Sequence, residues 1–361
     1  LHLLHDWWMP SFMLFGGVIE LLAVGWATSR PMTNLPLMVL DQDRSAASRA
    51  IVTALENTGT FAFEAQASNM ATIQDALDRS KVNAAVIIPP GFDSKLASPT
   101  GRPSLAVLLN GAESTPATAA LRAVTGAVRE MGQRIALRRL GLDADEFAGF
   151  DASLRVWFNE EMKKANYTTP SEAGFIVGVM AAMIAAAAVA REREMGTLEQ
   201  LMVTPMRRVE LIAGKAIPAV VIPFVDFLMM LAITVWVFHI PLRGSPFLLM
   251  GLTLLFIVAE LGFGLVISAV SANQQQTLLF VFLLGILDMA FSGYLVAVEN
   301  MPSVLRFASN FSPIHHYLII VRGVMLKGAT LSDLWPQTLT LAALGAGILT
   351  LTFRSLRKRL D

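Results

Sequence analysis

The chain contains no cysteine, which excludes a disulfide framework and any thiolate metal or redox site. Charged residues are scarce as well, at 16% of 361 residues, and the formal net charge is zero. That balance indicates no particular partner, and nothing in the sequence points to nucleic acid. Hydrophobic residues make up 54% of the chain and the mean hydropathy is +0.57. This composition predicts a membrane protein and not a soluble globule.

Six apolar stretches are candidates for transmembrane helices. The first, residues 12–27, is short and contains Glu20, but the tryptophans on both sides of it suit interfacial anchors. We therefore expect a retained span within residues 1–29 and not the core of a signal peptide. Leu1 is not an initiator residue, so we expect the natural chain to begin upstream. The other five stretches are residues 174–190, 216–237, 247–270, 277–298 and 336–353.

Between the first two stretches, residues 30–169 have the composition of a soluble α/β domain. Apolar and β-branched runs predict strands, and helical spacing predicts helices between them. The strand runs are residues 35–40, 61–65, 84–88 and 105–109, and the helical runs are 46–55, 73–77 and 115–140. The last helix is expected to lead back to the membrane. The predicted fold class is an α-helical polytopic membrane protein with six transmembrane helices and an α/β extracytoplasmic insert domain.

The loop after the second span fixes the predicted orientation. Residues 191–218 read REREMGTLEQLMVTPMRRVELIAGKAIP, with five basic residues, and the C-terminal tail adds four more. The short connections on the other side hold four, namely Arg243, Arg306, Arg322 and Lys327. By the positive-inside rule, this loop and both termini are expected to be cytoplasmic, and residues 30–169 extracytoplasmic.

The same loop contains the pattern of a short amphipathic helix. Thr197 and Gln200 have the spacing of a capping box, and Pro205 ends the run. Apolar residues at 195, 198 and 202 fall on one face, while acids and amides lie among the basic residues. A helix of this kind suits a protein partner better than an aqueous surface.

At these residues the chain resembles the permease subunits of type 2 ATP-binding-cassette exporters. The family pattern is Arg-Glu-x-Glu-x-Gly-Thr-x-Glu-Gln-Leu-x-Val-Thr-Pro, followed by Glu-Leu-x-x-Gly-Lys-x-x-Pro. A basic loop would arise from the positive-inside rule alone, but sixteen matched positions in order would not. They are Arg191, Glu192, Glu194, Gly196, Thr197, Glu199, Gln200, Leu201, Val203, Thr204, Pro205, Glu210, Leu211, Gly214, Lys215 and Pro218.

The resemblance implies that residues 191–206 form the coupling helix, which docks on a separate ATP-hydrolysing subunit. ATP and magnesium would then bind to that partner, and this chain would be a transport subunit with no cofactor and no enzymatic activity of its own. It also implies a dimer with an identical or similar permease, in a bacterial inner membrane. The large insert favours efflux of drugs or small amphiphiles, and it could bind a periplasmic adaptor protein.

Two alternatives to this function remain open. The chain could be a membrane-anchored surface receptor or structural protein that has the permease architecture without an ATPase partner. It could also export another substrate, such as Na⁺, a lipid or a polysaccharide.

Four acidic residues lie near the middle of four different predicted spans, none of which contains Lys or Arg: Glu20, Asp226, Glu260 and Asp288. An acid at mid-bilayer costs about 2.5–3.5 kcal/mol on insertion scales, so we expect these side chains to face other helices or a cavity. They could line the substrate path and favour a cationic amphiphile or exchange protons. Alternatively, they could act only as interhelical hydrogen-bonding groups.

No arrangement of residues predicts a catalytic or metal site. His315 and His316 are adjacent and have no nearby acid or third histidine, so a metal site there is not expected. Asp41, Asp43 and Ser45 lack the glycine and distal glutamate of an EF-hand, and they predict a turn followed by a helix cap.

Overall fold

The structure, a computed structural model, describes residues 8–29, 32–98, 101–139, 157–159, 163–194, 196 and 208–360. The chain divides into a helical unit, residues 1–30 with 155–361, and an α/β unit, residues 31–154. Within the described residues, five helices are long and apolar enough to cross a membrane: Lys164–Arg191, Ile217–Trp236, Pro246–Val270, Gln274–Phe291 and Leu331–Thr352. The apolar helix Leu14–Ser29 is shorter. The chain is thus a polytopic helical membrane protein.

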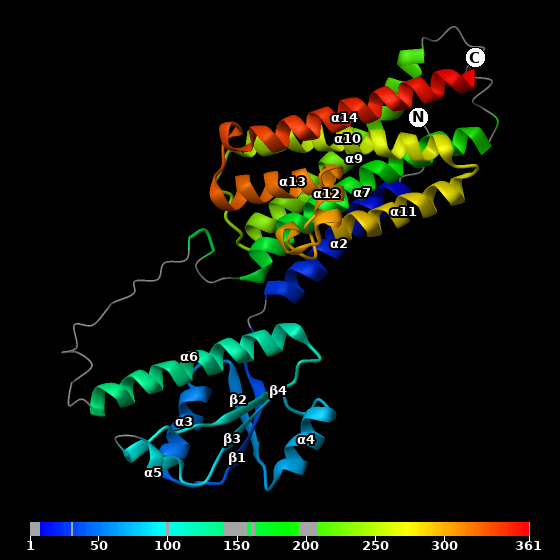
Figure 1. The fold of residues 1–361 in the computed structure, drawn as a ribbon. Helices are drawn as coiled ribbons and strands as arrows, with labels where there is room; N and C mark the ends of the chain where they lie inside the picture. Colours follow the sequence, from blue (N-terminus) through cyan, green and yellow to red (C-terminus); the bar gives the residue numbers. More distant parts are fainter. Residues whose placement is uncertain are drawn as a thin grey trace. The chain divides into compact units, whose positions relative to one another are not determined.

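The helical unit is arranged around one central helix, α7 (Lys164–Glu194), which packs against α2, α9, α10, α11 and α13 (Figure 1). Small residues make this packing possible, because they allow the backbones of neighbouring membrane helices to approach closely. The surrounding helices are α2 (Trp8–Ser29), α9 (Arg208–Trp236), α10 (Pro246–Val270), α11 (Gln274–Phe291), α12 (Ser303–Ser309), α13 (Pro313–Arg322) and α14 (Leu331–Leu360).

Glycines set the distance between α7 and its neighbours. A Cβ atom at Gly264 of α10 would lie 2.2 Å from the backbone oxygen of Ala182 in α7. A Cβ at Gly178 of α7 would lie 2.7 Å from the ring of Phe256, which stacks on Tyr317 with ring centroids 4.2 Å apart. The three helices α7, α10 and α13 therefore form one tightly packed core.

Residues 299–335, which we predicted to be an outer connection, are largely helical. Ser312 caps α13 by accepting a hydrogen bond from the backbone N–H of His315 at 3.2 Å, and Pro313 occupies the first helical turn. A π-helical turn, η2 (Gly323–Lys327), follows directly. Because α13 packs against α7, α10 and α14, Arg322 is part of a packed helix and does not belong in a count of loop charges.

The fifth apolar stretch also ends earlier than the sequence predicts. Helix α11 ends at Phe291 and not at residue 298. Gly293 follows with a φ of +83°, in the left-handed region that ends helices readily. A short 3₁₀ turn, η1 (Val298–Asn300), lies within the stretch that joins α11 to α12. Residues 294–298 therefore belong to the connection after α11, in which Leu295 and Val296 are exposed, and not to a further turn of that helix.

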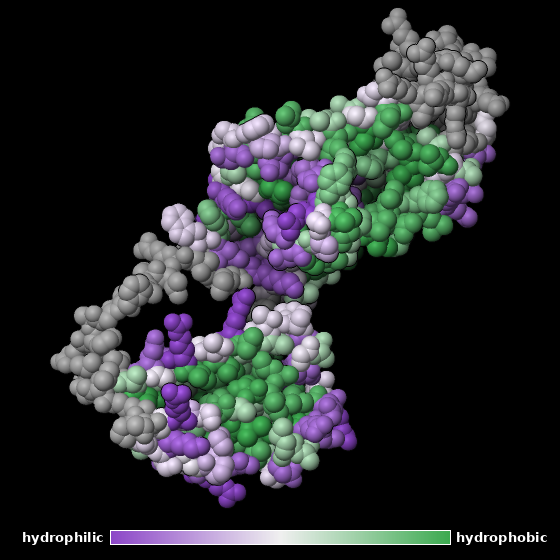
Figure 2. Space-filling view, viewed as in Figure 1, coloured by the Kyte–Doolittle hydropathy of each residue, from purple (hydrophilic) through white to green (hydrophobic). Residues whose placement is uncertain are grey.

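The surface of the helical unit agrees with a lipid environment. Figure 2 shows a broad apolar area on its visible face. Large apolar side chains are exposed along α11, among them Leu279, Phe282 and Leu283. Soluble monomers rarely expose contiguous apolar patches of this kind, so this area suits lipid or another membrane helix.

The α/β unit contains a four-stranded sheet in the order β2-β1-β3-β4. Strand β1 (Leu35–Asp41) is parallel to β2 (Phe61–Gln66) and β3 (Ala84–Ile88), and β4 (Ala106–Leu109) is antiparallel to β3. Alternate residues of β1 pack against different helices, as both faces of a covered sheet require. The helices are α3 (Ala46–Glu56), α4 (Met70–Asp78), α5 (Phe92–Ala97) and α6 (Ser114–Arg139).

The predicted turn and cap after β1 are confirmed. Asp41 accepts hydrogen bonds from the backbone of Asp43 and Arg44, and Ser45 caps α3 by accepting from Ser48 at 3.0 Å. Asp43 reaches further, and its carboxylate accepts 3.0 Å hydrogen bonds from the backbone N–H groups of Phe92 and Asp93 at the start of α5. The three polar residues thus hold two helices against the sheet.

Candidate functional site

The described part of the predicted coupling segment, residues 191–206, continues helix α7. Residues 191–194 form the end of that helix, and Arg191, Glu194 and Gly196 are exposed. Gly196 has a φ of +64°, a conformation that suits glycine after a helix end. Six of the predicted coupling residues lie outside the described residues: Thr197, Glu199, Gln200, Leu201, Thr204 and Pro205. For Glu192 the structure describes the backbone, which is helical.

Glu194 connects this segment to a second membrane helix. Its side chain accepts a hydrogen bond of 3.0 Å from the backbone N–H of Gln274, the first residue of α11. A carboxylate at a helix N-terminus satisfies a free N–H group and complements the positive end of the helix dipole. Asn273 caps the same helix by accepting from Gln276 at 2.7 Å. Glu194 thus links the end of α7 to the start of α11.

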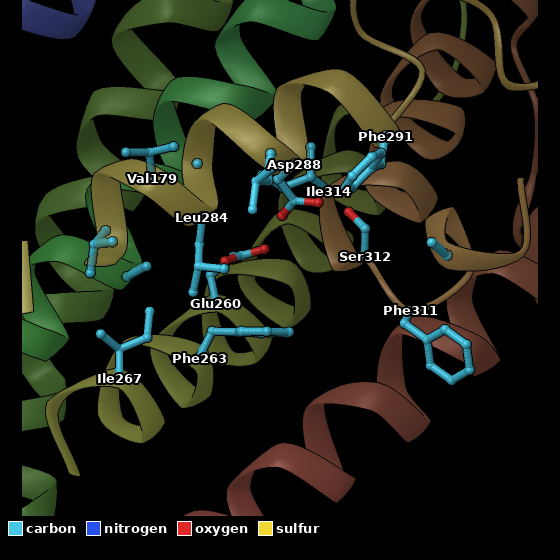
Figure 3. Close-up of a pocket in the computed structure, with 15 residues that line it drawn as sticks. Val179, Glu260, Phe263, Ile267, Leu284, Asp288, Phe291, Phe311, Ser312 and Ile314 are labelled. Atoms are coloured by element: carbon cyan, nitrogen blue, oxygen red, sulfur yellow. The ribbon is translucent and has the colours of Figure 1, made fainter. Parts of the chain in front are cut away.

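Helices α7 and α11 are also two walls of a cavity of about 310 Å³. Helix α10 forms a third wall, and residues of α12 and α13 close one side (Figure 3). Glu260 from α10 and Asp288 from α11 both point into this space, with Ser312 beside them (Figure 3). The remaining lining is apolar and includes the rings of Phe263, Phe291 and Phe311.

The two carboxyl groups in the cavity differ in exposure. Glu260 is 5% exposed, and its Oε1 atom has no hydrogen-bond partner among the described residues. Asp288 is half-buried, and Ser312 lies beside it in the lining (Figure 3). Glu260 therefore forms the back of the cavity and Asp288 its more open side.

The other two predicted acids lie elsewhere. Asp226 of α9 is fully buried, and neither of its carboxyl oxygens has a hydrogen-bond partner among the described residues. It faces α2 and α7, where a Cβ atom at Gly17 would lie 2.8 Å from Oδ2. Glu20 of α2 has an exposed side chain. The structure thus brings together Glu260 and Asp288 but not all four acids.

A polar network that the sequence did not predict joins α7 to the loop after α11 and to α13. Tyr294 donates a hydrogen bond to the buried Glu172, and Tyr167 donates one to the carbonyl of Gly293 at 2.7 Å. Arg322 donates from Nε to Ser171 at 2.7 Å and from Nη2 to the same carbonyl at 3.0 Å. Its guanidinium lies 3.7 Å from the centroid of the Tyr167 ring. We missed this network because we began the second span at residue 174 and treated Arg322 as a loop residue.

The adjacent histidines of α13 both lie against backbone carbonyl groups. His315 Nδ1 lies 3.0 Å from the carbonyl of Ser292, and His316 Nε2 lies 3.0 Å from the carbonyl of Asn310. Within the described ranges, no group of three or more His, Asp or Glu side chains is placed to hold a metal ion.

Comparison with known proteins identifies the architecture. The profile of the ABC-2 family transporter protein matches residues 7–354. The chain belongs to the ABC-2 transporter family. This confirms the resemblance predicted from the coupling-segment motif.

The ABC-2 permease is similar along most of its length to several bacterial permeases. It is 27% identical over 340 residues to the probable multidrug ABC transporter permease YbhR of Escherichia coli, and the aligned region covers 93% of this chain and 91% of the relative. It is 28% identical over 361 residues to the probable multidrug ABC transporter permease YbhS of the same organism, covering 98% and 93%. The linearmycin resistance permease protein LnrN of Bacillus subtilis is 23% identical over 321 residues, covering 82% and 81%.

Proposed function

We propose that this ABC-2 permease is the membrane subunit of an ATP-driven exporter of drugs or other small amphiphilic compounds. A separate ATP-binding subunit docks on residues 191–206 and supplies the energy. Two permease subunits, identical or similar, complete the pathway. The observation that carries the proposal is the hydrogen bond between Glu194 and Gln274, because it connects the coupling segment at the end of α7 to the start of α11.

In the proposed mechanism, a displacement of residues 191–206 shifts α7 and α11 together. A push on residues 191–206 acts on the end of α7 and, through Glu194, on the start of α11. Both helices line the cavity that holds Glu260 and Asp288, so its width changes when they shift relative to α10. Packed helices have discrete arrangements and deform little, which is what an alternating-access movement requires.

The proposed orientation places residues 191–206 and both termini in the cytoplasm of a bacterial cell and the α/β unit outside the inner membrane. The α/β unit is then free to contact a periplasmic adaptor protein. Support for drug-like substrates comes from the relatives, two of which are named probable multidrug permeases and one a linearmycin resistance permease.

Charge reversal at Glu194 tests the coupling. The permease is co-expressed with candidate ATP-binding subunits, purified as a complex and reconstituted into liposomes. Glu194→Lys places a cation at the positive end of α11 and removes the acceptor for Gln274. We expect it to abolish ATP-driven transport, while Glu194→Gln, which retains an acceptor oxygen, keeps a measurable part.

Glu64→Lys is the matched control, since this exposed acid lies on strand β2 of the α/β unit. It should behave as the wild type. A Glu194→Lys complex that assembles and transports normally would remove the proposed coupling. Failure of every ATP-binding subunit to co-purify would instead favour a surface receptor with permease architecture.

A further inference from the structure

Among the described residues, the lining of the cavity between α7, α10 and α11 contains two acids and no base. None of the 15 residues that line it is Lys, Arg or His. The ion pairs found among the described residues, Arg79–Asp75 and Arg134–Glu130, both lie in the α/β unit. The cavity therefore presents two carboxyl groups that no basic side chain of its described lining can pair with.

Glu260 adds an observation that points to a ligand. It is almost fully buried, and its Oε1 has no hydrogen-bond partner in the part of the chain that the structure describes, although buried polar atoms in proteins nearly always have one. A carboxyl oxygen left in this state inside an apolar space costs free energy unless a donor or a cation reaches it. Figure 3 shows that the Glu260 carboxyl group points into the cavity, where such a group would sit.

The lining identifies the class of that cation. Three side chains of the described lining carry oxygen: Glu260, Asp288 and Ser312. A Ca²⁺ ion takes about six to eight oxygen ligands, and Mg²⁺ keeps several bound waters that need polar groups around them, so a mostly apolar wall favours neither ion. The rest of the wall is aliphatic and aromatic, and aromatic faces attract organic cations. The volume of about 310 Å³ suits one small amphiphilic molecule.

We infer that Glu260 and Asp288 form a recognition site for organic cations, with Asp288 at the open side and Glu260 at the back of the cavity. An ammonium group lies between the two carboxyl groups and its apolar body packs against the phenylalanine rings. This inference rests on the proposed export function and specifies which substrates the exporter prefers. Glu260 is the stronger determinant, because charge interactions gain strength with distance from water.

The test uses two ligands of the same shape that differ in charge. Benzyltrimethylammonium carries a quaternary nitrogen, and neopentylbenzene has carbon at that position. For each ligand, the reconstituted complex with its ATP-binding subunit gives an apparent affinity from stimulated ATP hydrolysis. Equilibrium binding to the purified complex without ATP gives a second value that does not depend on turnover.

In the wild type we expect the cation to bind more tightly than its neutral analogue. Glu260→Gln should reduce this preference by about ten- to a hundredfold, because the quaternary ammonium loses an opposite charge while the neutral analogue does not. Asp288→Asn should reduce it less. Asp226→Asn, which changes a buried acid outside this cavity, should leave the cation-to-neutral ratio unchanged whatever it does to the total activity.

Equal losses for both ligands in Glu260→Gln, or an unchanged ratio in both cavity variants, would overturn the inference. If Glu260→Gln does not assemble, Asp288→Asn on the more exposed helix decides the question alone. The proposed function has a separate outcome, since it fails if no ligand stimulates ATP hydrolysis by the wild-type complex. Stimulation with an unchanged ratio would retain the exporter and reject the cation site.

Discussion

The contact between α7 and α10 at Gly264 gives a quantitative test of the packing. A Cβ atom at this position would lie 2.2 Å from the backbone oxygen of Ala182 and 2.9 Å from its carbonyl carbon. Backbone atoms cannot rotate away as a flexible side chain can. Because ordinary carbon contacts need about 3.5 Å, the two helices must move apart by roughly 1 Å to accept alanine.

The expected cost follows from two opposing effects. Alanine is the better helix former, which favours the variant by about 1 kcal/mol. Overpacking in a close-packed core costs about 1–3 kcal/mol and sometimes more. At Gly264 the clash is with backbone, so we expect the upper end of that range and a net loss of about 2 kcal/mol. This corresponds to a melting temperature lower by about 4–8 °C.

Gly251 provides the matched control on the same helix. It lies in α10, and a Cβ atom there would have no heavy atom within 4 Å. Gly251→Ala should therefore leave the melting temperature unchanged or raise it slightly, because only helix propensity acts. Intrinsic fluorescence of the six tryptophans follows unfolding of the purified protein in detergent. Equal melting temperatures for Gly264→Ala and Gly251→Ala would refute the close approach of α7 and α10.

Two further predictions concern polar contacts. Arg322→Lys should lower the melting temperature by several degrees, because lysine cannot hold Ser171 and the carbonyl of Gly293 together while stacking on Tyr167. Arg134→Lys, at an exposed ion pair on α6, should change the free energy of unfolding by no more than about 0.5 kcal/mol. Similar losses of stability in Arg322→Lys and Arg134→Lys would contradict the network. Hydrogen bonds from Ser45 and from the start of α5 lower the pKa of Asp43 below its usual 3.8. The ionised carboxylate therefore contributes fully to stability above pH 3.8, and this contribution is lost as the pH falls through the lowered pKa of the folded state. Asp43→Asn should therefore be less stable than the wild type at neutral pH, and the difference should narrow in acid; a constant difference across pH would exclude the ionised carboxylate as the cause.

Much of the architecture could be read from the sequence. The strands of the α/β unit begin and end within one residue of the predicted runs, because each is a short apolar stretch bounded by polar residues. The helix cap at Ser45 was predictable because its signal is local. The family was predictable from the coupling-segment motif, since sixteen residue types in a fixed order carry far more information than hydropathy does.

Tertiary packing determines the position of one apolar stretch that hydropathy alone could not place. The stretch from Pro313 to Leu326 is apolar, but it is too short to cross a bilayer, so hydropathy assigned it to a connection. In the structure, helix α13 lies in the buried core against α7 and α10. Its length would have been a usable signal, because a half-length apolar run that contains an arginine is unusual in a loop exposed to water.

The four membrane acids show the same limit. Their cost in a bilayer predicted that all four would face other helices or a cavity; burial of Asp226 and Glu260 agrees with that reasoning, whereas Glu20 is exposed. Which acids share a cavity depends on the rotation of α10 and α11 about their axes. No pattern in a single sequence fixes that rotation, so the pairing of Glu260 with Asp288 required the structure.

The position of the coupling segment tests the central claim most directly. Since the chain has no cysteine, Thr197→Cys places a single thiol in that segment, and Glu56→Cys places one at the end of α3 in the α/β unit. A bifunctional thiol reagent is added to inverted membrane vesicles that contain the permease and its ATP-binding subunit. The account predicts that Thr197→Cys is cross-linked to the ATP-binding subunit with loss of ATP-driven transport, while Glu56→Cys is labelled only from the vesicle interior and transports normally. Labelling of Thr197→Cys only from the interior, or its cross-linking without effect on transport, would contradict it.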